Sequence, residues 1–237
     1  MSKRAVILAG GQGARLKPYT VVLPKPLMPI GEFPILEVIV RQLARNGFDR
    51  VTIAVNHQAE LIRAFFNGAA RWDLEIDFSK EHKPLSTIGP LRLIPDLPED
   101  FLVMNGDILT DLDLAELFDF HVRNKNLFTV SSKIREQNID YGVLESDGEG
   151  KLRDFKEKPT HRYEVSMGVY VANRRVLDLI PEDRSYGVND LLLDLIAARL
   201  PVQVRRYEGY WLDIGRPDDY AQAIEEFDQM RARFLGE

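Results

Sequence analysis

Residues 4–16 read RAVILAGGQGARL, an apolar run followed at once by three glycines and an arginine. The unbroken apolar run at 4–9 is typical of a strand that is buried on both faces. Glycines directly after a strand leave backbone N–H groups uncovered and let a ligand approach closely, which suits phosphate oxygens. Arg15 adds a permanently charged array of donors that can bridge two phosphate oxygens. The stretch predicts a strand that ends in an anion-binding turn, although three glycines alone would also fit a tight turn beside a surface arginine.

Strand and helix patterns alternate through the first two-thirds of the chain. Further strands are expected at 51–55, 74–78, 101–105 and about 127–133, with helices at 34–46, 59–66 (closed by Gly68) and about 113–124. The later part predicts an antiparallel hairpin around 147–150, strands at 166–172 and 202–207, and helices at 189–199 and from Pro217. This order favours one compact α/β domain over 1–237, with a mainly parallel sheet, helices on both faces, and a ligand beyond the carboxyl ends of the strands.

Composition excludes several classes of protein. The 237 residues carry a formal net charge of −6 and no long Lys/Arg run, which makes nucleic-acid binding a poor expectation. Cysteine is absent, so disulfides, thiolate metal sites and cysteine nucleophiles are excluded. The first residues lack the apolar core of a signal peptide, and no apolar run reaches the length of a membrane span. We therefore expect a cytoplasmic protein with no membrane partner.

Two further motifs carry charges suited to phosphate chemistry. LPKPL at 23–27 places Lys25 between two prolines, where an extended backbone is expected because the residue before a proline avoids the helical region. Asp107 follows an apolar strand and the pair Asn105-Gly106, a suitable position for a ligand of a hard cation such as Mg²⁺. Each also has a plain structural interpretation, a surface lysine on a stiff loop and a turn or cap residue respectively.

The C-terminal half contributes two more motifs. FKEKP at 155–159 ends the predicted hairpin, and in a strand Glu157 and Lys158 would face opposite sides; exposed charge on an edge strand is the commoner explanation. Asp213 lies among Trp211, Leu212 and Ile214, which are normally buried, so its carboxylate needs a cation or several donors. A second metal ligand and a buried helix cap both satisfy this need.

Other motifs do not fit. The dinucleotide fingerprint needs Gly or Ala at the position of Leu16, and the Walker pattern Gly-Lys-Ser/Thr is missing. The histidines at 57, 82, 121 and 161 have no ligand spacing. Asp111-Leu-Asp113 has the Asp-x-Asp form of a glycosyltransferase metal motif, although a role at the start of the 113–124 helix explains it better.

Together, LAGGQGARL, LPKPL, NGD, FKEKP and WLDIGRPDDY resemble, in order and spacing, the sugar-1-phosphate nucleotidyltransferases, from about residue 4 to 228. The resemblance implies a Rossmann-like, glycosyltransferase-A type fold, a mainly parallel mixed sheet flanked by helices with a small antiparallel sugar-binding part. Residues 1–133 would form the nucleotide-binding part, and 134–237 the sugar-phosphate-binding part and the C-terminal helix. The implied reaction joins a nucleoside triphosphate to a sugar 1-phosphate and releases pyrophosphate, with Mg²⁺ as cofactor and a homo-oligomer left open.

The resemblance also implies a role for each matching residue. Arg15, Lys25 and Asp107 would be catalytic, and Asp107 and Asp213 would hold Mg²⁺. The nucleotide would contact Leu8, Ala9, Gly10, Gly11, Gly13, Glu81, Ser86, Thr87 and Gly106. The sugar phosphate would contact Gly142, Glu157, Lys158 and Ser166, the last standing where the family usually has Asn.

The base and the sugar are less determined. Glu81 occupies a base-reading position, and a carboxylate accepts from the N1–H and amino groups of guanine but offers nothing to cytosine's acceptors. GTP is therefore favoured, with a mannose, heptose or aminosugar 1-phosphate, as in the guanylyltransferase subgroup that the motifs resemble. The same reaction with UTP, CTP or dTTP, and a non-catalytic sugar-nucleotide-binding regulator, remain alternatives. Such a regulator would be expected to have lost Lys25, Asp107 or Asp213, and all three are present.

Overall fold

A computed structural model describes residues 3–56, 58–67 and 72–236. Seven strands form the central sheet in the order β12-β8-β11-β6-β1-β4-β5. Their bounds are β1 Arg4–Leu8, β4 Arg50–Val55, β5 Glu75–Lys80, β6 Asp100–Asn105, β8 Phe128–Asn138, β11 Thr160–Asn173 and β12 Val202–Arg206. All neighbours run parallel except those of β11, which is antiparallel to both β6 and β8. The expected α/β class with a mainly parallel mixed sheet is confirmed.

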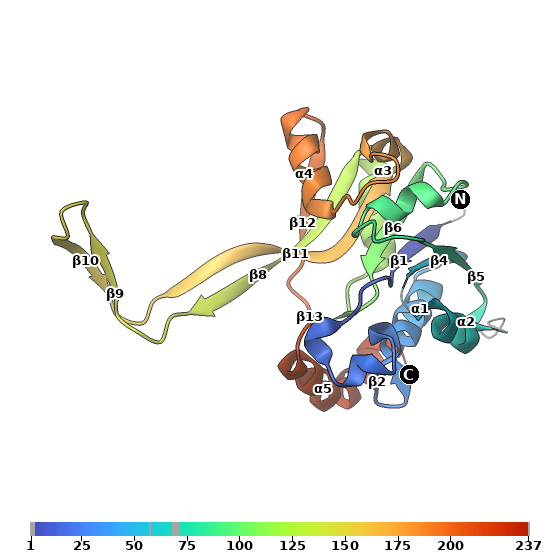
Figure 1. Cartoon of the computed structure of the whole chain (residues 1–237), viewed down its shortest axis with the longest axis horizontal. Helices are drawn as coiled ribbons and strands as arrows, with labels where there is room; N and C mark the ends of the chain where they lie inside the picture. The colour runs from blue at the N-terminus through green and yellow to red at the C-terminus, as the bar shows by residue number, and fades with distance from the viewer. Residues whose placement is uncertain (1–2, 57, 68–71, 237) are drawn as a thin grey trace.

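Helices cover both faces of this sheet (Figure 1). They are α1 Ile35–Arg45, α2 Ala59–Phe66, α3 Leu114–Arg123, α4 Val188–Ala197 and α5 Pro217–Leu235. Alternate residues of β1 belong to different cores: Ala5 and Ile7 pack with α1, α2, α3 and α5, whereas Val6 packs with α4. A central parallel strand buried on both faces requires this unbroken apolar run, and therefore the first motif of the sequence has no polar alternation.

The expected elements all occur, with shifts at their ends. Helix α1 begins directly after Pro34, and Asp113 caps α3 by accepting from the backbone N–H of Glu116. The Gly68 expected to close α2 lies outside the described residues. None of the helices in the described part of the chain is both long and apolar enough to cross a bilayer.

Three small two-stranded pairs were not expected or only partly expected. Strands β7 (Ile108–Thr110) and β13 (Trp211–Asp213) pair antiparallel, as do β2 (Pro29–Ile30) and β3 (Phe33–Pro34). The expected hairpin forms from β9 (Val143–Ser146) and β10 (Leu152–Lys156). It lies at the end of a long ribbon made by the outer parts of β8 and β11, which projects from the body in Figure 1.

Candidate active site

The glycine turn after β1 is built as the sequence predicts. Gly13 has a left-handed backbone (φ 60°), and a Cβ there would lie 2.8 Å from a methyl of Thr20, so only glycine fits. Gly11 has open space around the position of a Cβ. The turn therefore leaves room for a ligand at Gly11 while Gly13 is packed underneath it.

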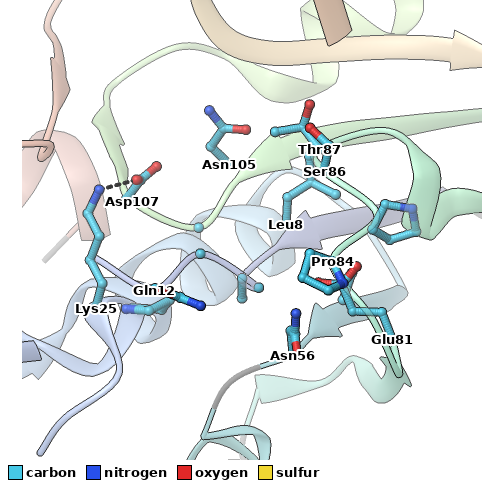
Figure 2. Close-up of a pocket in the computed structure, with 17 residues that line it drawn as sticks. Leu8, Gln12, Lys25, Asn56, Glu81, Pro84, Ser86, Thr87, Asn105 and Asp107 are labelled. Atoms are coloured by element: carbon cyan, nitrogen blue, oxygen red, sulfur yellow. Dashed lines mark hydrogen bonds and ion pairs between the residues drawn. The ribbon is translucent and has the colours of Figure 1, made fainter. Parts of the chain in front are cut away.

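A cavity of about 410 Å³ opens at the carboxyl ends of β1, β4 and β6. Figure 2 shows its side chains converging from the glycine turn, the 81–90 segment and the end of β6. Eight of the nine residues expected to contact the nucleotide line it: Leu8, Ala9, Gly10, Gly11, Glu81, Ser86, Thr87 and Gly106. Gly13 does not, because it is packed against Thr20 and Lys25.

Lys25 and Asp107 form an ion pair at the edge of this cavity (Figure 2). Lys25 is buried, and it begins a single 3-10 turn, Lys25–Leu27, rather than an extended segment as expected. The N–H of Leu27 donates to the carbonyl of Pro24 at 2.8 Å, and that of Met28 donates to the carbonyl of Lys25 at 3.0 Å. These two hydrogen bonds and the burial of the turn outweigh the conformational bias of a residue before proline.

Asp213 lies beside Asp107 because β13 pairs with β7. The register sets Asp213 opposite Ile108, and the N–H of Ile214 donates to the carbonyl of Asp107 at 3.1 Å. Burial and the charge of Asp107 raise the pKa of Asp213, although Lys25 and Arg15 oppose the shift. Arg15 reaches the same place, since its Nη2 lies 3.6 Å from the position of a Cβ on Gly215, as does the Asp213 carboxylate.

The pair of aspartates fits a divalent cation. Oδ1 of Asp107 is buried without a hydrogen-bond partner, while Oδ2 pairs with Lys25. A buried carboxylate oxygen without a partner is unfavourable, and carboxylate oxygens are the ligands that Mg²⁺ prefers, so a divalent cation would supply the missing partner. Among the described residues no cluster of three or more such side chains occurs, so other ligands would come from substrate or water.

Glu81 is buried at the base of the cavity rather than on the surface. Its Oε2 accepts from the backbone N–H of Leu85 at 2.9 Å, and its Oε1 lies 2.9 Å from the position of a Cβ on Gly10. The carboxylate thus joins the glycine turn to the 81–90 segment. Ser86, on that segment, has φ 65°, and Thr87 accepts from the N–H of Val188 at 2.9 Å.

The residues expected to hold the sugar phosphate are divided between two places. Ser166 bonds the hydroxyl of Tyr170 at 2.9 Å near the root of the ribbon. Gly142, Glu157 and Lys158 lie together next to the start of β9 and the end of β10. These two strands lie at the end of the ribbon, away from the body of the protein (Figure 1). The expected alternation of Glu157 and Lys158 in a strand is wrong, because β10 ends at Lys156 and Lys158 has φ 43°.

Asp111 has a structural role. Its carboxylate pairs with Arg233, accepts from the hydroxyl of Tyr207 and accepts from the N–H of Tyr210 at 2.7 Å. With Asp113 occupied as the cap of α3, the Asp-x-Asp sequence has no free carboxylate in this arrangement.

The three histidines in the described part of the chain are not among the residues that line the cavity. His121 is buried against Thr129, with Nδ1 2.8 Å from its hydroxyl, and burial lowers the pKa of His121. His82 and His161 are exposed. His57 lies outside the described residues.

Sequence reasoning missed several residues that line the cavity: Gln12, Pro26, Ala54, Asn56, Pro84, Pro90 and Asn105. Three of them had a usable signal. Gln12 is inside the glycine turn, and Asn56 and Asn105 stand at or just beyond the carboxyl ends of β4 and β6, where ligands of parallel sheets bind. The prolines and Ala54 gave no such signal.

Curated proteins are similar to this chain in sequence. UTP--glucose-1-phosphate uridylyltransferase from Synechocystis sp. is 34% identical over 241 residues, covering 93% of this chain and 62% of that protein. Mannose-1-phosphate guanyltransferase from Yarrowia lipolytica is 34% identical over 225 residues, covering 92% and 62%. The chain therefore spans about three-fifths of the length of these curated relatives.

Solved structures agree with the fold. The crystal structure of HddC from Yersinia pseudotuberculosis superposes with a TM-score of 0.75 at 25% identity, covering 95% of this chain and 99% of that one. The same protein complexed with GMP-PN gives a TM-score of 0.73. The pattern of the family described as "Nucleotidyl transferase" matches residues 4–230. Because this match covers nearly the whole chain and the two curated relatives are each 34% identical to it, the chain belongs to the nucleotidyl transferase family.

Proposed function

We propose that this chain transfers a nucleotidyl group from a nucleoside triphosphate to a sugar 1-phosphate and releases pyrophosphate. The observation that carries the proposal is the joint placement of Lys25, Asp107, Asp213 and Arg15 at the edge of the glycine-turn cavity. Two cations and two carboxylates at the mouth of an anion-binding turn suit a reaction whose charge develops on phosphate oxygens.

The proposed reaction is an in-line displacement. A phosphate oxygen of the sugar 1-phosphate attacks the α-phosphorus, and the bond from that phosphorus to the bridging oxygen breaks, so that pyrophosphate leaves with the electron pair. Backbone N–H groups at Gly10 and Gly11 would bind the nucleotide's phosphates, and Arg15 would neutralise the departing pyrophosphate. Lys25 would stabilise charge on the α-phosphate. Positioning and charge suffice here, and no covalent nucleophile is needed.

Mg²⁺ is the proposed cofactor, held by Asp107 and Asp213. Such an ion would supply positive charge that lowers the repulsion of the phosphate oxygens toward the attacking oxygen. The unpaired Oδ1 of Asp107 supports this assignment. Binding is measurable without turnover, as a rise in melting temperature on adding MgCl₂ that is lost in Asp107→Asn.

GTP is the proposed donor because of Glu81. Its buried carboxylate lies in the cavity, where it can accept from the amino and N1–H groups of guanine. The relatives include both a guanyltransferase and a uridylyltransferase by name, and the solved relative was complexed with GMP-PN. UTP is therefore the main competing donor. A mannose-, heptose- or aminosugar-type 1-phosphate is the proposed acceptor.

The test is a pyrophosphate-release screen of GTP, UTP, ATP, CTP and dTTP against a panel of sugar 1-phosphates. Release with at least one pair, lost in Asp107→Asn and Asp213→Asn, is expected. Binding of nucleotide sugars without pyrophosphate release from any pair would instead indicate a non-catalytic regulator. Release of free nucleoside diphosphate from a nucleotide sugar would indicate a glycosyltransferase.

A further inference from the structure

The ribbon formed by residues 133–165, here called the arm, projects from the body of the protein (Figure 1). Strand β12 pairs with β8 only up to Ser132, and β6 pairs with β11 only from Val169 onward. Beyond these points β8 and β11 pair only with each other, and β9 and β10 form a separate two-stranded sheet at the end. None of the 33 arm residues, all described, is buried. A two-stranded ribbon without a core is marginal in water on its own.

The end of the arm carries apolar side chains that are unusual for an exposed hairpin. Tyr141 is 79% exposed, Leu144 65% and Phe155 51%. Leu144 and Phe155 are direct cross-strand partners, so they share one face of the hairpin. The Phe155 ring lies against Gly142, where a Cβ would be only 2.5 Å from it. An exposed apolar cluster of this kind marks a surface that contacts a partner.

The arm's direction is fixed at its root. Glu164 pairs with Arg206 of β12 at 3.0 Å and accepts from the hydroxyl of Ser132 at 2.8 Å. Lys133 donates to the carbonyl of Glu208 at 3.2 Å. These contacts attach both strands of the arm to the edge of the sheet.

The two strands of the arm are also paired along its length. Seven successive register pairs join residues 132–138 to 160–166, a ladder of about 20 Å at the rise of a strand. Gly168, beyond this ladder, abuts Asn105 beside the cavity, where a Cβ would lie 2.6 Å from its amide nitrogen. Gly142, Glu157 and Lys158 are therefore more than one ladder length from the cavity of their own chain.

We propose that two copies of this chain exchange arms, so that the hairpin of one copy covers the cavity of the other and completes its sugar-phosphate site. Lys158 of each arm would then meet Asp107 and Asp213 of the other copy across the bound phosphates. The identity of the ligand rests on the proposed function; the exchange does not. Reciprocal exchange about a two-fold axis closes the assembly at two copies and buries both apolar clusters.

The charge of Lys158 and the attachment of the arm both suit this arrangement. Among the described residues Lys158 has no ion-pair partner, whereas neighbouring Lys156 pairs with Glu145 at 2.6 Å. The cavity edge brings together Asp107, Asp213, Lys25 and Arg15, and the phosphates bound there would add the negative charge that Lys158 meets. Folding of the arm back onto its own cavity would need the ladder or the Glu164–Arg206 root to break. A second copy can contact the hairpin while the ladder and the Glu164–Arg206 ion pair both stay intact.

Complementation between two inactive variants tests the exchange. Asp213→Asn removes a cavity carboxylate and leaves the arm intact, while Lys158→Ala alters only an exposed arm residue. The two variants are mixed and allowed to exchange chains, and two affinity tags verify that mixed dimers have formed. Half of the dimers should then be mixed, and each mixed dimer has one complete site out of two, so about one quarter of the wild-type rate should return. No recovery in verified mixed dimers would overturn the proposal.

A second readout does not depend on activity. The chain has no cysteine, so the double variant Lys158→Cys, Arg216→Cys carries the only two thiols, one on the arm and one beside the cavity. A short bismaleimide should link it into a dimer-sized product on a denaturing gel, and each single variant should remain unlinked. A monomer-sized product with an internal link would show an arm that serves its own chain and would overturn the proposal. If the wild-type protein were inactive with every substrate pair, only the proposed function would be refuted. The cross-linked products would still show whether the arms are exchanged.

Discussion

Asp107 and Asp213 share one site, yet we expect their replacement by asparagine to change the stability of the metal-free protein in opposite directions. Asp107 holds the ammonium of Lys25, whose side chain is only 10% exposed. In Asp107→Asn that buried cation loses its counter-charge, which costs about 3–5 kcal/mol. The repulsion between the two carboxylates is relieved here too, but this gain of about 1 kcal/mol offsets only part of the cost. Asp213 has no such partner, and burial and the charge of Asp107 raise its pKa. In Asp213→Asn an unfavourable charge is removed.

The size of the gain follows from the pairing of β7 with β13. Asp213 stands opposite Ile108, the residue after Asp107, and the charge of Asp107 acts on Asp213. Two unit charges roughly 6 Å apart repel by about 3 kcal/mol at an effective dielectric constant of 20. Lys25 and Arg15 offset part of this repulsion, which leaves a net gain of about 1 kcal/mol for Asp213→Asn. That gain corresponds to a rise of about 2–4 °C in melting temperature.

The gain should depend on pH. A carboxyl whose pKa is raised in the folded state destabilises the fold above that pKa, and the effect vanishes below the unfolded value of about 4. The advantage of Asp213→Asn should therefore be largest above the raised pKa of Asp213 and disappear as the pH falls toward 4. Thermal melts in EDTA measure it, with the exposed Asp218→Asn as a matched control that shifts by less than about 0.5 kcal/mol. A lower melting temperature for Asp213→Asn, or a higher one for Asp107→Asn, would refute the charge balance described here.

Three further substitutions probe the neighbourhood of the site. Asp111→Asn should lower the free energy of unfolding by about 2–4 kcal/mol, because the Asp111 carboxylate pairs with Arg233 and accepts from two other donors. Its turnover per folded molecule should not change. Lost turnover in a stably folded variant would indicate that Asp111 is a metal ligand. Gly13→Ala should lower the free energy of unfolding in urea by about 1–3 kcal/mol and raise KM for the triphosphate. The control Gly47→Ala, at φ 74° but with open space around the added Cβ, should lower it by only about 1 kcal/mol. Equal losses of stability in the two variants would rule out a steric clash at Gly13. Glu81→Gln should reduce the preference for GTP over UTP in kcat/KM by about 10-fold, and an unchanged ratio would remove Glu81 from base recognition.

Local patterns were enough to predict most of the architecture. The apolar run of β1, the turn after it and the helix limits at Pro34 and Pro217 are set by neighbours in sequence, through burial, backbone freedom and the missing N–H of proline. Alternating strand and helix patterns fixed the class of the sheet and the edge at which a ligand cavity opens. The lining of that cavity by eight predicted residues follows from this rule.

Other features depend on contacts that no local pattern contains. Strands β7 and β13 have three residues each, too few for a readable period, yet their pairing brings together two carboxylates more than a hundred residues apart. The burial of Glu81 depends on the Gly10 turn, which comes from another part of the chain. The hairpin of β9 and β10 was predictable from alternation and turn residues, but its position was not.

The sequence by itself thus determined the elements, their class of packing and the phosphate-binding turn, because these arise from interactions within about a dozen residues. Only the tertiary structure decided that Asp213 joins Asp107, that Asp111 serves Arg233, and that the arm leaves the body. Those outcomes depend on which strands pair at their edges and on how far β8 and β11 continue to pair after the neighbouring strands have ended. Both are properties of the assembled sheet.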